Sequence, residues 1–181
     1  MMDFLKILPP LCKNLDDGSI HYALIGGFAM AMRGVQRATL DLDFILSLED
    51  LEQADETLHE LGFERYFHSS NVSHYRNDQI VGRIDILHAF RKPALAMLDR
   101  AERLEIGEGW TLPVAAIEDI IGLKIQAINN DPARKDQDWP DIRLLIRTAR
   151  EQGQSLDWEL IEDYLSLFGM QDHLRKLRDE T

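Results

Sequence analysis

The sequence predicts an α/β (α+β) protein, in which a mixed β-sheet flanked by helices is followed by a C-terminal helical extension. Two observations support this fold class. Short apolar runs bounded by turn residues alternate with helical spacings as far as about residue 115. From residue 116 onward, the apolar residues follow helical spacings. We therefore expect a core over residues 1–115 and a helical region over residues 116–181.

The N-terminal part begins with alternating helices and strands. Residues 3–16 predict a short helix that Pro9 and Pro10 interrupt. A buried strand over residues 21–26 ends in glycine, and the Ala- and Met-rich segment that follows suits a helix over residues 27–34. Further strands are expected over residues 39–46, 63–67, 72–76, 80–87 and 110–115.

The remaining helices are predicted from their apolar spacing. Ser47 offers capping chemistry to an amphipathic helix over residues 47–63, and Pro93 marks the start of a helix over residues 92–106. The C-terminal helices are expected over residues 116–130, 138–153, 157–169 and 171–180. In the second of these, Pro140 is expected near the helix start, and Asp136, Asp138 and Asp141 are expected to be helix-cap acids; a catalytic role is the alternative.

The composition is ordinary for a globular protein, but the charge is acidic. Lys and Arg number 20 against 32 Asp and Glu, which gives a net charge of −12. This balance argues against sequence-independent binding of nucleic acid through many phosphate contacts. It permits a local basic pocket, or an acidic pocket that binds Mg²⁺. Cys12 is the only cysteine, which excludes an internal disulfide. Without a long apolar run or a signal-peptide pattern, we expect a cytoplasmic protein with no membrane contact.

Two aspartates stand inside the second predicted strand. Side chains at i and i+2 of a strand share a face, so Asp41 and Asp43 point the same way while Leu42 points to the other side. Two adjacent carboxylates repel and would not be left unpaired in a core. A hard divalent cation such as Mg²⁺ removes that conflict. A solvated edge strand is the alternative explanation for the pair.

Glycines and a third acid complete the pattern. Gly26 and Gly27 lie where a strand turns into a helix, and glycine lets backbone N–H groups approach a phosphate closely. Asp85 is again an acid within an apolar strand, and a neighbouring strand would bring it beside the first two acids. Together these residues suggest a site for two Mg²⁺ ions and a triphosphate. Alternatively, Asp85 pairs with Arg83 or Arg91.

This pattern resembles the nucleotidyltransferase superfamily that shares the DNA polymerase β fold. That superfamily shows G[GS], a spacer, DxD in a strand and a later acid; here Gly26-Gly27 is followed by a spacer of thirteen residues, Asp41-Leu42-Asp43 and Asp85. The stretch GGFAMAMRGVQRATLDLDFIL is most similar to the AbiEii/AbiGii-type toxin and aminoglycoside-nucleotidyltransferase-like branch. Its matching positions are Gly34, Arg37, Thr39, Asp41, Asp43 and Phe44, whereas Arg33 replaces the histidine usual in this branch.

The resemblance implies roles for further residues. Arg37 and Thr39 would lie at the nucleotide, although Arg37 could equally pair with Asp41 or with an acid of the C-terminal helices. The later segment EDIIGLKIQA…RKDQDWPDIRLL also resembles this branch, and by that match Lys124 would contact the triphosphate; a solvated lysine is the alternative. The resemblance covers residues 20–147.

The resemblance implies an enzyme that moves a nucleoside monophosphate from an NTP, ATP included, to a hydroxyl or phosphate acceptor and releases pyrophosphate. Asp41, Asp43 and Asp85 would bind the metal ions and act in catalysis. The acceptor could be a small molecule, tRNA or a protein. A non-catalytic nucleotide- or partner-binding relative is one alternative. Another is a toxin that acts on tRNA, is held by an antitoxin, and uses a basic face at Arg143, Arg147 and Arg150.

The histidines show no metal-ligand spacing. His68 and His74 flank a predicted turn, and we expect both to be exposed.

Overall fold

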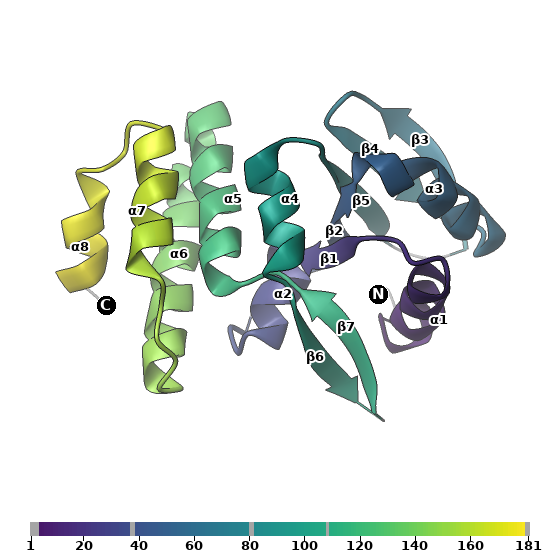
Figure 1. Ribbon diagram of the computed structural model, residues 1–181, viewed down its shortest axis with the longest axis horizontal. Coiled ribbons are helices and arrows are strands. Elements are labelled where there is room, and N and C mark those ends of the chain that lie inside the picture. The colour runs from purple at the N-terminus through teal and green to yellow at the C-terminus, as the bar shows by residue number, and fades with distance from the viewer. Residues whose placement is uncertain (1–3, 37–38, 80–81, 108, 180–181) are drawn as a thin grey trace. The chain divides into compact units, whose positions relative to one another are not determined.

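The computed structural model describes residues 4–36, 39–79, 82–107 and 109–179. By internal contacts the chain forms two compact units: residues 1–32 with 37–115, and residues 33–36 with 116–181. The first unit holds a seven-stranded sheet in the order β3-β4-β5-β2-β1-β7-β6 (Figure 1). Its strands are β1 (Tyr22–Ile25), β2 (Leu42–Ser47), β3 (Glu64–His68), β4 (Val72–Arg76), β5 (Arg83–Ala89), β6 (Glu102–Gly107) and β7 (Trp110–Val114).

The sheet is mixed, as expected from the sequence. β1 pairs with β7 and β2 with β5 in parallel, and the other neighbouring strands are antiparallel. The helices of this unit are α1 (Phe4–Asp17), α2 (Gly26–Met32), η1 (Leu48–Asp50), α3 (Leu51–Glu60) and α4 (Lys92–Asp99). Among the described residues, no helix is both long and apolar enough to cross a membrane.

Two helices cover one face of the central strands. Apolar side chains of α1 and α3 line one small cavity together with side chains of the sheet: Leu11, Leu15, Tyr22, Phe44, Leu46, Leu58, Ile84 and Ile86. Because neighbouring residues of a strand point to opposite faces, Asp43 and Asp85 project from the other face. The burial of Phe44, Ile84 and Ile86 thus determines which way the two carboxylates point.

The second unit is helical. It contains α5 (Ile117–Asn130), η2 (Pro132–Arg134), α6 (Lys135–Glu151), α7 (Trp158–Leu167) and α8 (His173–Asp179). Within it, the hydroxyl of Tyr164 in α7 donates to buried Asp119 in α5 at 2.7 Å, and Asp157 caps α7 by accepting from Glu159 N and Leu160 N.

The structure places several boundaries differently from the prediction, and four of these differences matter for packing or for the site. Pro9 and Pro10 lie inside a continuous helix α1, which is held on the sheet by its buried apolar face. The helix expected over residues 92–106 ends at Asp99, because the following segment pairs with β7 as strand β6. Helix α6 begins at Lys135, so Pro140 is internal.

The fourth boundary bears on the site. Strand β2 begins at Leu42 rather than at residue 39, so Asp41 lies at a bend just before it and Leu40 is 56% exposed. The strand continues to Ser47, whose side chain makes no capping hydrogen bond.

Candidate active site

Asp43 and Asp85 are neighbours across the parallel pair of β2 and β5. Their Cα atoms are register partners, flanked by Leu42 opposite Ile84 and Phe44 opposite Ile86. On the far side of β5, His74 of β4 is the register partner of Asp85. Three adjacent strands therefore place Asp43, Asp85 and His74 in one row across the sheet.

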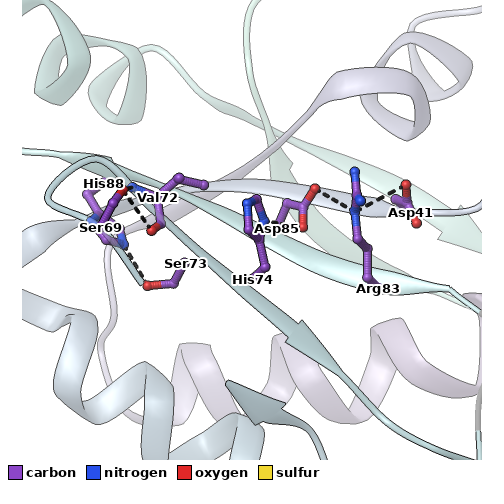
Figure 2. Close-up of polar contacts among 8 residues, drawn as sticks. All are labelled: Asp41, Ser69, Val72, Ser73, His74, Arg83, Asp85 and His88. Atoms are coloured by element: carbon purple, nitrogen blue, oxygen red, sulfur yellow. Dashed lines mark hydrogen bonds and ion pairs between the residues drawn. The ribbon is translucent and has the colours of Figure 1, made fainter. Parts of the chain in front are cut away.

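Arg83 joins Asp41 to this row. Its Nε lies 2.9 Å from Asp85 Oδ2 and 3.4 Å from Asp41 Oδ2, as Figure 2 shows. Arg83 reaches Asp85 because residues two apart in a strand share a face. Although burial lowers the pKa of the Arg83 guanidinium, the carboxylates of Asp85 and Asp41 raise it overall. The guanidinium is thus a counter-ion shared by two of the three acids.

The Asp43 carboxyl has a raised pKa. Its burial, together with the nearby charges of Asp85 and Asp41, raises its pKa from 3.8 to about 6. Arg83 and the backbone N–H of Gly27, which donates to Asp43, act in the opposite direction but do not cancel this effect. The acids therefore carry more negative charge than Arg83 neutralises, and a further cation would be stabilised there.

Only glycine at position 26 leaves room for the Asp43 carboxylate. Its φ is +68°, a backbone conformation that favours glycine, and a Cβ there would lie 2.1 Å from Asp43 Oδ2. A Cβ on Gly27 would meet Thr39 Cβ at 3.0 Å. The two glycines at the start of α2 thus allow Asp43 and Thr39 to approach the backbone closely. Contact of either glycine with a phosphate stays a prediction.

Thr39 organises the segment before β2. Its hydroxyl donates to the backbone carbonyl of Asp41 at 3.1 Å and lies 3.4 Å from the Asp41 N–H. This turn holds Asp41 next to the start of β2, although Asp41 is not part of the sheet. Arg37, also expected at the nucleotide, lies outside the described residues.

Lys124 belongs to the second unit and is not a solvated lysine. Its ammonium donates to Asp138 at 2.8 Å and to Asp141 at 2.6 Å, and Arg134 donates to Asp138 at 2.7 Å. Although burial raises it, the hydrogen bonds and charges of Arg134 and Lys124 lower the pKa of the Asp138 carboxyl overall. Asp138 is fully buried, so it acts as the centre of an ion cluster rather than as a helix cap. Contact of Lys124 with a triphosphate stays a prediction.

The sequence analysis did not assign two side chains, those of His74 and Arg83, to the site. His74 was expected to be exposed, but its Nδ1 lies 2.6 Å from Asp85 Oδ1 and its side chain is 26% exposed. Arg83 was considered only as an ordinary partner of Asp85, whereas it also binds Asp41. Aligning the predicted strands over residues 72–76 and 80–87 as a hairpin with Arg76 opposite Arg83 would have placed His74 opposite Asp85.

The donor set suits a hard divalent cation, although it is not arranged around one. Within the described ranges, no three His, Cys, Asp or Glu side chains form a group that could hold a metal ion. The guanidinium of Arg83 lies between Asp41 and Asp85 and forms ion pairs with both. Carboxylate oxygen is the ligand that Mg²⁺ prefers, and burial together with the charges of Asp85 and Asp41 raises the pKa of the Asp43 carboxyl. The residues therefore fit Mg²⁺.

Solved structures share this architecture. The antibiotic-resistance factor ANT(2″)-Ia, solved in complex with adenylyl-2″-tobramycin, superposes with a TM-score of 0.66 at 16% identity, over 93% of this chain and 98% of that chain. The chain has the nucleotidyltransferase fold. The expectation drawn from the sequence is thereby confirmed for the fold.

Two further solved structures are similar to this chain in fold. An antigenic nucleotidyltransferase-like protein from Paracoccidioides brasiliensis has a TM-score of 0.57 at 20% identity, over 97% of this chain and 92% of that chain. The lincosamide antibiotic adenylyltransferase LnuA, solved with lincomycin bound, has a TM-score of 0.54 at 16% identity, over 78% and 93%. No protein-family model and no curated protein sequence matches the chain.

Proposed function

We propose that the protein is a Mg²⁺-dependent nucleotidyltransferase that moves a nucleoside monophosphate from an NTP to an acceptor hydroxyl or phosphate. One observation carries the proposal: Asp43 and Asp85 are register partners on adjacent strands, and Arg83 ties Asp41 to Asp85. The three acids are of the type that this chemistry would use, and nucleotidyltransferases share this fold.

The three aspartates have separate roles in this proposal. Asp41, Asp43 and Asp85 would hold two Mg²⁺ ions, which when bound supply charge neutralisation of the triphosphate. Asp85 accepts the proton of the acceptor hydroxyl. The acceptor oxygen then forms a bond to the α-phosphorus, the bond from that phosphorus to the bridging oxygen breaks, and pyrophosphate leaves. The chain contributes mainly by positioning and by pre-arranged charge.

Arg83 acts as the resident counter-ion of the site. Its side chain is 48% exposed, so it can leave the carboxylates when other cations bind. Gly26, Gly27, Thr39 and Arg37 are the proposed nucleotide contacts.

We favour a small-molecule acceptor over RNA. A net charge of −12 opposes the phosphate contacts that a tRNA surface requires, whereas a small acceptor needs only the site itself. ANT(2″)-Ia and LnuA were both solved with antibiotic compounds bound. A toxin with tRNA as acceptor and an antitoxin as partner is the second candidate, and labelled tRNA would favour it.

Label transfer tests the proposal. The protein is incubated with each α-³²P-labelled NTP, Mg²⁺ and a cell extract, and the labelled product is identified. Wild type is expected to transfer label, Asp43→Asn is expected to transfer none, and Asp163→Asn on an exposed position of α7 serves as the matched control. Binding of NTP–Mg²⁺ without transfer from any NTP would indicate a non-catalytic relative and contradict the proposal.

A further inference from the structure

His74 holds one oxygen of Asp85, and Arg83 holds the other. His74 Nδ1 lies 2.6 Å from Oδ1, and Arg83 Nε lies 2.9 Å from Oδ2. Figure 2 shows the Asp85 carboxylate between the two side chains. The His74 side chain is 26% exposed against 48% for Arg83, so the histidine is the better fixed of the two partners.

An irregularity in β3 brings two aromatic rings to His74. Between the pairs Arg65–Tyr75 and Phe67–His74, β3 advances by two residues while β4 advances by one. Tyr66 is therefore the extra residue of a β-bulge, which lets consecutive side chains lie on the same side of a strand. Bulges of this kind occur at sheet edges and next to active sites, where they redirect a side chain.

Both rings stack on the histidine. The ring centroids of Phe67 and His74 are 5.0 Å apart with an interplanar angle of 30°, and those of Tyr66 and His74 are 5.9 Å apart with an angle of 25°. Tyr66 and Phe67 remain 47% and 46% exposed, so they do not fill a core. These two stacking contacts restrict rotation of the His74 ring.

We propose that His74 is a positioning residue for Asp85. It donates Nδ1–H to Oδ1, and the stacked rings of Tyr66 and Phe67 keep it in that orientation. Oδ2 is then the oxygen that faces the acceptor and the metal ions once Arg83 has moved away. This inference rests on the proposed function, since it assigns the working oxygen of the proposed base.

A conservative substitution separates positioning from mere packing. In His74→Asn the side-chain amide nitrogen replaces Nδ1, whereas His74→Ala removes the donor. We expect His74→Ala to lower kcat for label transfer by about 10- to 100-fold with little change in KM for the NTP. His74→Asn should recover most of that loss. His59→Ala, at an exposed position of α3, controls for loss of a histidine.

A readout without activity completes the test. In ¹⁵N NMR spectra of the metal-free protein, His74 is expected to carry its proton on Nδ1, and Asp85→Asn should shift its ring signals. A ring protonated on Nε2 alone, or unchanged ring signals in Asp85→Asn, would overturn the inference. So would wild-type kcat in His74→Ala while wild type transfers label. A wild type that transfers no label from any NTP would instead overturn the proposed function, and the assigned working oxygen with it.

Discussion

Asp43 of β2 and Asp85 of β5 face the same side of the sheet as register partners in a parallel strand pair. Neighbouring strands are about 4.8 Å apart, so the two carboxylates are held side by side on adjacent strands. Repulsion between them is built into the fold, and its consequences can be measured in the metal-free protein.

The first prediction concerns stability against pH. Burial and the neighbouring acids raise the pKa of Asp43 from 3.8 to about 6, so the folded protein binds this proton more tightly than the unfolded chain. Stability should therefore fall as pH rises from about 4 to about 6, with the full penalty above that range. Asp43→Asn should raise the free energy of unfolding at pH 7 by up to about 2–3 kcal/mol, but not at pH 4. Urea unfolding in EDTA at both pH values measures the difference. Equal effects at the two pH values would contradict the prediction.

The second prediction compares two glycines with similar backbones. Gly26 and Gly153 have φ of +68° and +70°, but only at Gly26 would a Cβ collide, with Asp43 Oδ2 at 2.1 Å; nothing lies within 4 Å at Gly153. Gly153→Ala should cost about 1–2 kcal/mol of stability from backbone strain alone. Gly26→Ala should cost more and should also abolish label transfer, because Asp43 is displaced. Similar losses in both variants, with transfer retained, would show that Asp43 does not depend on Gly26.

The third prediction concerns the resident counter-ion. If Arg83 stands where a metal ion binds, Arg83→Gln should strengthen Mg²⁺ binding in calorimetry, because the competing charge is gone. Arg103→Gln is the matched control, since Arg103 binds Asp16 and Thr111 of the same unit rather than the three acids. Weaker Mg²⁺ binding in Arg83→Gln than in the control would mean that Arg83 supports the metal site instead of competing with it.

The fourth prediction concerns the ion cluster of the second unit. Asp138 is fully buried between Lys124 and Arg134, so Asp138→Ala removes one of the two carboxylates that bind the buried ammonium of Lys124 and should cost up to about 3–5 kcal/mol. Because the pKa of Asp138 is lowered, its contribution is present above the ordinary value of 3.8 and is lost as pH falls through the folded value. Asp136→Ala, at an exposed position in the same turn, should cost far less. Thermal unfolding of both variants checks this.

Local patterns in the sequence predicted much of the fold. The apolar run before Gly26, the Asp43 strand and the Asp85 strand were expected, and Ile84 and Ile86 are buried as the alternation required. The amphipathic spacing of α3 and α5 was equally informative. Each of these elements buries one face, and the apolar residues of that face recur in the sequence with the period of a helix or a strand.

Features that depend on pairing partners were missed. Strand β6 follows α4 without a turn signal, and only its pairing with β7 makes it a strand. His74 lies 11 residues from Asp85 in the chain, and their contact depends on the register of a hairpin. The second partner of Arg83, Asp41, is 42 residues away, so no local pattern reveals it. Register and long-range pairing are tertiary properties, which a single sequence does not display.

The turnover of Asp85→Asn tests the central claim most directly. Asn keeps the size of the side chain but cannot accept the acceptor proton, so kcat for label transfer should fall by at least about 100-fold. Affinity for NTP–Mg²⁺, measured by calorimetry on the same sample, should change far less, because Asp41, Asp43 and the glycine turn remain. A variant that transfers label at the wild-type rate would show that Asp85 is not the base and that this row of carboxylates is not the reaction centre.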